Sequence, residues 1–340
     1  MSHDALAHLL AVAIILALNA YVLLGGADFG GGVWDLFARG PRRDRQRDLI
    51  IHAMGPVWEA NHVWLIVVVV LLFTCFPGVF ARLAIAMHIP LSLVLVGIVL
   101  RGSAFTFRSY GSESSAAERR WGRVFAVASL VTPLLLGVAV GTIAAGRVRS
   151  PAGQSFLADY VTPWFTPFAW GVGLFTLVLF AFLAAVYLTL EARGEPALQE
   201  DFRRRALAAG IAAFGVAVLT IVLAWRDAPL MWRGLMARPQ AVLVHALTAI
   251  AAVTALAALH RRRYGLARLA AAAQVTAILW GWALAQYPYL LPPDLTVTGA
   301  AAPALTLGLT AAALAAGGLV LVPSLRYLFR VFKGAGTGVR

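Results

Sequence analysis

Apolar runs of about 20 residues, separated by short arginine-rich segments, recur along the whole 340-residue chain. Each run is long enough to cross about 30 Å of hydrocarbon as an α-helix. Hydrophobic residues make up 61% of the sequence and charged residues 13%, which leaves too few polar side chains to cover a soluble globular surface. The chain is therefore predicted to be an all-α, polytopic membrane protein without a soluble domain.

Nine of these runs qualify as transmembrane helices, and short loops make consecutive helices antiparallel neighbours. The first run lacks a basic leader and a clear cleavage motif, so we expect it to remain as a helix. The expected architecture is two four-helix bundles plus one extra helix. The expected spans are 6–30, 50–74, 79–100, 122–145, 165–190, 206–225, 239–259, 267–287 and 303–325.

A faint internal repeat supports that grouping. The sequence LNAY at 18–21 and the sequence AAVY at 184–187 each precede an arginine-rich loop. This spacing predicts one integral membrane domain over 1–340, with pseudo-repeats at about 1–145 and 160–287 and a final helix at about 303–325.

Basic residues are distributed unequally between alternate loops. Of the 28 Lys and Arg, 22 fall on one side of the predicted membrane and 6 on the other. Because cytoplasmic loops collect Lys and Arg, this places the N-terminus outside and the C-terminus in the cytoplasm. The same placement explains the net charge of +13 without a nucleic-acid partner. The single cysteine, Cys75, excludes an intrachain disulfide and reads as a packing residue.

The stretch 52–64, HAMGPVWEANHVW, concentrates reactive side chains at the start of the second run. An ionisable residue inside a membrane span is energetically costly, so it is expected to have a charged or hydrogen-bonding partner, to face a water-filled cavity or to serve a function such as proton transfer. Asp28 and Glu59 each lie 11 residues outside the loop 39–48, so they are expected at similar depth from the cytoplasmic side. They predict an inward proton path with Asn61 as a buried hydrogen-bond partner, and the alternative for Glu59 is a structural ion pair.

Five glycines between positions 25 and 32 leave two interpretations of the first span open. They could interrupt the helix, or they could permit close approach of a neighbouring helix. Gly26 and Gly30 have the small-xxx-small spacing typical of the second case.

Metal and haem sites are weakly supported. Glu59 and His62 have the Glu-x-x-His spacing of di-iron bundles, but the second copy and further acids that such sites need are missing, so no metal is predicted. A lone histidine in an apolar helix is more often a hydrogen-bonded packing residue than an axial haem ligand. The histidines weighed as haem ligands are His52, His62, His88 and His245.

Arg101 follows the third run and is separated from Arg108 by a Ser- and Phe-containing segment. One interpretation is an anchor whose side chain reaches toward the cytoplasmic interface. The other is that both arginines contact a lipid or quinone head group or a partner subunit.

The segment GPVWEANHVWL at 55–65 resembles the signature that opens helix 2 in subunit II of the cytochrome bd-type quinol oxidases. DFG at 28–30, followed by Gly32, looks like the end of that family's helix 1. FTFRS at 105–109 is similar to its aromatic-arginine stretch, and 287–307 is similar to the segment before its last helix. The resemblance covers nearly the whole chain.

The resemblance implies a bacterial plasma-membrane (inner-membrane) complex that oxidises quinol and reduces oxygen to water. It implies that this chain carries no haem and that the paired subunit I binds b- and d-type haems. It also allows a small accessory subunit, a structural quinone and bound lipids.

The same resemblance gives roles to individual residues. Glu59 matches the family acid associated with proton delivery, and Asp28 matches the helix-1 acid; Asn61 and His62 join them in the expected path. Trp58 and Trp64 match indoles at an oxygen route or subunit interface. A secondary transporter, also built from repeated bundles with buried acids, is the alternative function.

Overall fold

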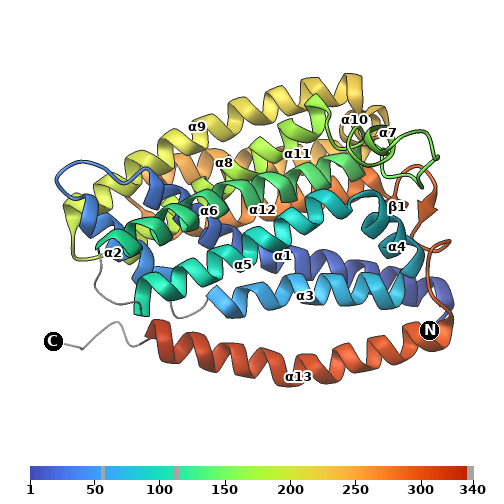
Figure 1. Cartoon of the computed structure of the whole chain (residues 1–340), viewed down its shortest axis with the longest axis horizontal. Helices are drawn as coiled ribbons and strands as arrows, with labels where there is room; N and C mark the ends of the chain where they lie inside the picture. Colours follow the sequence, from blue (N-terminus) through green and yellow to red (C-terminus); the bar gives the residue numbers. More distant parts are fainter. Residues whose placement is uncertain (55–57, 111–114, 335–340) are drawn as a thin grey trace.

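The computed structural model describes residues 1–54, 58–110 and 115–334, without the side chains of 58–60, 108–110, 115–119, 329 and 332–334. Its helices run mostly side by side (Figure 1). They are α1 (His3–Leu36), α2 (Arg43–Met54), α3 (Trp58–Cys75), α4 (Pro77–Ala86), α5 (His88–Tyr110), α6 (Ser115–Ala144), α7 (Phe156–Tyr160), α8 (Pro167–Glu191), α9 (Pro196–Asp227), α10 (Pro229–Met236), α11 (Pro239–His260), α12 (Tyr264–Gln286) and α13 (Ala304–Gly334). Two short antiparallel strands, β1 (Tyr289–Leu291) and β2 (Leu295–Thr296), precede α13.

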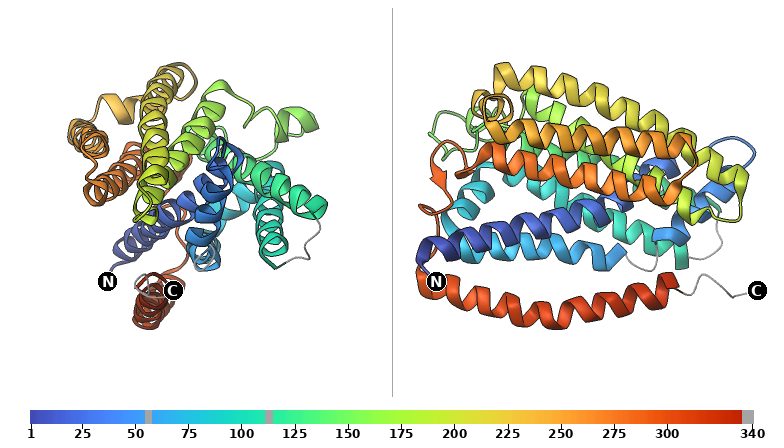
Figure 2. Two further views of the ribbon diagram at one scale, coloured as in Figure 1. Left: turned by 90° about the vertical axis from the view of Figure 1, so that its left-hand side faces the viewer. Right: turned by 180° about the vertical axis from the view of Figure 1, so that it is seen from behind.

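The predicted all-α polytopic fold is confirmed. Within the described ranges, eight helices are long and apolar enough to cross a membrane, or nine if α3 and α4 count as one broken span. Helices α1, α3, α5 and α6 pack as one group and α8, α9, α11 and α12 as another, joined where α1 and α6 pack against α8. The end-on view shows α13 beside the first group, where it contacts α1 and α3 (Figure 2).

The glycine-rich part of α1 remains helical and lies between two neighbouring helices. A Cβ on Gly30 would collide with the backbone carbonyl of Phe180 on α8, and a Cβ on Gly32 would collide with the hydroxyl of Ser129 on α6. Gly26 likewise faces the Phe180 ring. Close helix approach is therefore the correct interpretation of these glycines, and α1 extends six residues beyond the predicted end at residue 30.

The third predicted span, 79–100, is wrong in its first half. Helix α4 is bent by 116° from α3, and the spanning helix α5 begins only at His88. Pro77 starts α4 because proline suits the first turn of a helix and cannot continue the preceding one. The guanidinium of Arg82 then pairs with Asp294 at 2.9 Å, which ties α4 to the turn between β1 and β2.

The second predicted span, 50–74, begins too early. Its first residues belong to α2, which buries Gln46, Ile50 and Met54 and packs against α1 and α8. The spanning helix α3 starts at Trp58, and residues 55–57 lie outside the described ranges. The last residues of α2 are apolar because they are buried against neighbouring helices. Hydrophobicity alone therefore cannot distinguish them from the first residues of a membrane span.

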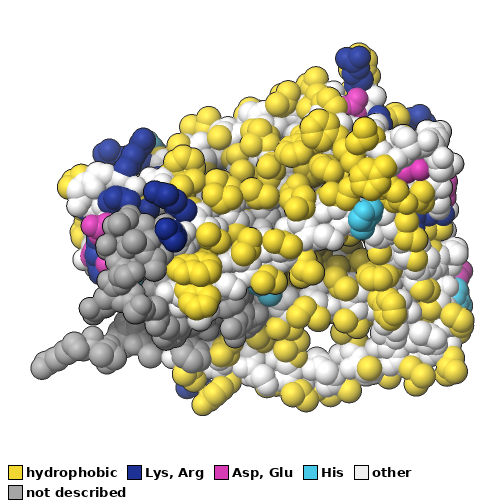
Figure 3. All heavy atoms as spheres, viewed as in Figure 1, with side chains coloured by type: hydrophobic (Ala, Val, Ile, Leu, Met, Phe, Trp, Pro, Cys, Tyr) yellow, Lys and Arg dark blue, Asp and Glu magenta, His cyan; other side chains and the backbone are white. Residues whose placement is uncertain are grey.

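Hydrophobic side chains cover the middle of the molecule, and charged side chains gather toward its two ends (Figure 3). The outward residues of α11 are among the most exposed: Val242 is 72% exposed and Val253 is 66% exposed. In water this surface would be unfavourable, which agrees with helices long and apolar enough to cross a membrane.

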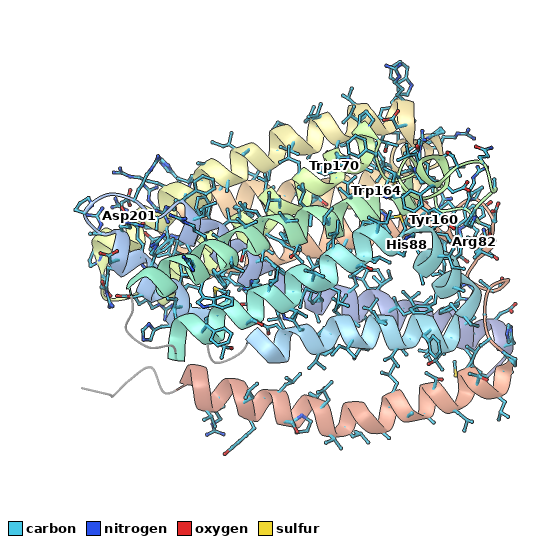
Figure 4. The ribbon with its side chains drawn as sticks, in the orientation of Figure 1. Arg82, His88, Tyr160, Trp164, Trp170 and Asp201 are labelled. Carbon is cyan, nitrogen blue, oxygen red and sulfur yellow. The ribbon has the colours of Figure 1, made fainter. Side chains whose placement is uncertain are left out.

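Short helices and loops complete the end of the molecule where α1 begins. His88 packs edge-on against Tyr160 of α7, with ring centroids 5.0 Å apart, and the Trp164 indole donates to the Tyr160 carbonyl at 2.7 Å. Figure 4 shows these residues and Arg82 at one end of the molecule, with Asp201 at the other.

Replacement of Gly30 by Ala should loosen the α1–α8 contact, because the added methyl meets backbone rather than a movable side chain. We expect a loss of about 1–3 kcal/mol, measured as a lower thermal midpoint of the detergent-solubilised protein. Gly215→Ala in α9 is the control, since nothing lies within 4 Å of a Cβ there. An unchanged midpoint for Gly30→Ala would contradict the close approach.

Candidate functional site

Asp28 lies inside the first helix group, although it is a carboxylate in an otherwise apolar helix. It is 5% exposed, and the Asn61 side chain of α3 donates a hydrogen bond to its Oδ2 at 2.5 Å. Asn61 itself is 3% exposed. The structure therefore brings together two of the residues predicted for the proton path.

Arg101 belongs to the same site rather than to a helix end. Helix α5 continues to Tyr110, so this guanidinium lies within the bundle and is 2% exposed. Its Nε donates to the Ser129 hydroxyl of α6 at 3.2 Å, and its Cζ lies 4.7 Å from the Phe29 ring centroid and 5.2 Å from that of Phe125. These contacts join α5 to α1 and α6 of the same chain.

Aromatic rings border the site. His62 lies edge-on to Tyr21 at 5.9 Å and tilted against Phe29 at 5.8 Å between ring centroids. The Tyr21 side chain is 2% exposed and lies within electrostatic range of both Asp28 and Arg101. His62 thus borders the cluster through ring packing.

The site is a buried acid, an amide, a guanidinium and two hydroxyls among aromatic rings. Asp28 and Arg101 are close enough for their charges to interact, which offsets the cost of burying each charge. Three buried polar atoms of this site have no hydrogen-bond partner in the described part of the chain: Tyr21 Oη, Asn61 Oδ1 and Arg101 Nη2. Chemically, the arrangement can bind a proton and exchange hydrogen bonds with internal water.

The remaining predicted residues are placed as follows. Trp64 is half-buried and packs between the clusters around Phe29 and around Leu71. Trp58 and Glu59 open α3, and Arg108 lies near the end of α5. The side chains of these last three residues lie outside the described part of the structure.

Sequence reasoning missed Tyr21 and Ser129. Tyr21 had a usable signal, because it stands seven residues before Asp28 and so lies on the same face of α1. Ser129 had none, since a serine in an apolar run reads equally well as a residue bonded to its own helix.

The described residues contain no group of three or more His, Cys, Asp or Glu that could hold a metal ion. A cavity of about 390 Å³ at the end carrying α7 is lined by residues of the segment 145–163 and by Asp227, without a histidine. His52 and His245 each contact a carbonyl of their own helix through Nδ1, at 2.7 and 2.6 Å. This cavity does not fit a haem, because its lining offers no histidine ligand.

Ion pairs connect α2 to the start of α9 at the other end. Arg42 pairs with Asp201 at 2.7 Å and Arg45 with Glu195 at 2.5 Å. Arg45 holds the pKa of the Glu195 carboxyl below its usual range, chiefly by hydrogen bonding. Any stability this pair contributes is therefore present above the usual pKa of glutamate and is lost as the pH falls through the lowered value.

A family model described as cytochrome bd terminal oxidase subunit II matches residues 6–332. The chain belongs to this family. The family result agrees with the resemblance of the segment 55–65, and it favours an oxidase subunit over the transporter alternative.

Individual relatives of this subunit II chain agree. It is 28% identical over 237 residues to cytochrome bd ubiquinol oxidase subunit 2 of Bacillus subtilis, covering 68% of this chain and 67% of the relative. It is 24% identical over 336 residues to a putative cytochrome bd menaquinol oxidase subunit II of the same organism, covering 95% of each. A solved bd oxidase structure from Geobacillus thermodenitrificans shares the fold, with a TM-score of 0.80 at 23% identity over 96% of this chain and 98% of that one.

Replacing Arg101 by Met should destabilise this subunit II, because Asp28 then loses its interacting cation inside the bundle. We expect a loss of about 3–5 kcal/mol in the single variant, measured as thermal stability of the purified complex. The double variant Asp28→Asn, Arg101→Met should recover most of it, since neither charge remains buried alone. Equal losses in the two variants would show that the charges are not coupled.

Proposed function

We propose that this chain is the haem-free subunit II of a cytochrome bd-type quinol:oxygen oxidoreductase and supports proton and oxygen access to a haem-bearing subunit I. The b- and d-type haems of that partner would pass electrons from quinol to oxygen. Reduction of oxygen to water consumes protons, so the complex needs a polar route through an apolar bundle.

The buried cluster around Asp28 is the observation that carries this proposal. A carboxylate held by Asn61 and facing Arg101 is costly inside a membrane protein, and such residues usually mark ion or proton pathways. Glu59 lies one helical turn or less from Asn61 and His62 on α3, which places it at the same end of the bundle. We therefore assign Asp28, Glu59, Asn61 and His62 to a proton path.

Trp58 and Trp64 are assigned to an oxygen route or to the subunit I interface. The half-buried Trp64 packs among apolar residues, and such surroundings suit an apolar gas better than a proton. For Arg108 we retain a contact with a lipid, a quinone head group or subunit I.

We propose a cellular location and an orientation in the membrane for this chain. Membership of this family supports a position in the bacterial inner membrane, and the count of basic residues favours an N-terminus outside and a C-terminus in the cytoplasm. A small accessory subunit, a structural quinone and lipids complete the proposed partners.

Asp28→Asn and Glu59→Gln should each slow quinol-driven oxygen consumption of the purified complex by on the order of tenfold or more, because each removes a proton-carrying group. Turnover is expressed per haem, read from reduced-minus-oxidised spectra, because Asp28→Asn leaves the Arg101 charge buried without its counter-charge and should lower the amount of assembled complex. Glu59→Gln should keep wild-type haem content and subunit stoichiometry. Asp4→Asn, at an exposed acid near the start of α1, is the control. Wild-type turnover in both path variants would show that these acids carry no protons.

A further inference from the structure

Three buried polar residues recur at intervals of seven along α1: Tyr21, Asp28 and Asp35. They are 2%, 5% and 1% exposed. Seven residues are nearly two helical turns, so all three lie on one face, with about 10 Å between successive positions. This face continues the site around Asp28 toward the arginine-rich end of the molecule.

Side chains from other helices line the interval between Asp28 and Asp35. The Ser129 hydroxyl of α6 lies directly beside Gly32, which is one turn beyond Asp28 and just short of Asp35. Arg101 of α5 donates to that hydroxyl and interacts electrostatically with Asp28. The polar groups thus form a column along α1 rather than an isolated pair.

Buried atoms in this column lack partners in the described part of the chain. Tyr21 Oη, Asn61 Oδ1 and Arg101 Nη2 are such atoms, and their side chains are at least nine-tenths buried. Buried polar atoms of this kind are normally satisfied by internal water, which also conducts protons between side chains.

Arg47 of α2 lies between Asp35 and solvent. Its Nε is 3.7 Å from Asp35 Oδ1, and its side chain is 29% exposed whereas that of Asp35 is 2% exposed. Arg205 of α9 also reaches this end of α1, where it lies over the Trp34 ring at 5.4 Å. Other helices packed against α1 carry these ionisable residues at the same end: Glu59 on α3, Arg123 on α6, Glu191 on α8, Arg268 on α12 and Arg330 on α13.

We propose that Asp35 is the cytoplasmic entry residue of the proton path, and that Arg47 positions its carboxylate. The inference rests on the proton-path role proposed above for Asp28. In each cycle the Asp35 carboxylate accepts a proton from cytoplasmic water and becomes neutral. It then releases that proton into the column toward Asp28 and returns to the carboxylate, while Arg47 keeps its charge throughout.

A purely structural Asp35–Arg47 pair is the competing explanation, because the pair also joins α2 to α1. The two explanations differ when both partners are removed. If the pair is only structural, replacing both partners by neutral residues costs little stability and leaves turnover unchanged. If Asp35 is the entry residue, the same double replacement still lowers turnover, because no carboxylate remains to accept the proton.

The test measures quinol-driven oxygen consumption of the purified complex as a function of pH. Asp35→Asn should lower turnover by on the order of tenfold or more, and the deficit should grow as the pH rises from about 6 to about 8, where free protons become scarce. Asp35→Glu should restore most of the rate. The double variant Asp35→Asn, Arg47→Gln should remain slow, and it also serves if the single variant fails to assemble.

Asp44→Asn, at an exposed acid of α2, is the matched control and should behave as wild type. Wild-type turnover of Asp35→Asn, or recovery of turnover in the double variant, overturns the entry role of Asp35. If Asp28→Asn is slow in the same assay, the proposed proton path through Asp28 still stands. Wild-type turnover of Asp28→Asn removes the path itself, and with it the entry role of Asp35.

Discussion

The interaction on which the first helix group depends is the one between Asp28 and its neighbours on α3 and α5. A carboxylate and a guanidinium in an apolar bundle are tolerated only when they are paired and hydrogen-bonded. Asn61 supplies the hydrogen bond to Asp28, and Arg101 supplies the opposite charge while it donates to Ser129. Four helices, α1, α3, α5 and α6, therefore contribute side chains to one polar cluster.

Close packing of α1 makes that cluster compatible with the rest of the fold. Gly30 lets α1 approach the α8 backbone, and Gly32 leaves room for the Ser129 hydroxyl. The same residues that allow the two helix groups to meet thus bring a hydroxyl into the polar column. Substitutions here would affect packing and the site together, because both use the same face of α1.

The sequence predicted the architecture and part of the site, for reasons that differ from residue to residue. Long apolar runs identified the spanning helices, and the motif at 55–65 identified the family. The break at Pro77 and the boundary between α2 and α3 were not predictable from hydrophobicity, since apolar residues continue past Pro77 and the last turns of α2 are as apolar as the start of a span. Arg101 was expected at a helix end because an arginine after an apolar run usually anchors there, and only the partners on α1 and α6 reveal its buried position.

The central claim is that the polar column along α1 carries protons used in oxygen reduction. The most direct test is to mix the fully reduced complex with oxygen and follow proton uptake with a pH-indicator dye while oxygen binding is followed optically. The account predicts that Asp28→Asn binds oxygen at the wild-type rate but takes up protons more slowly. Proton uptake at the wild-type rate in that variant would contradict the account.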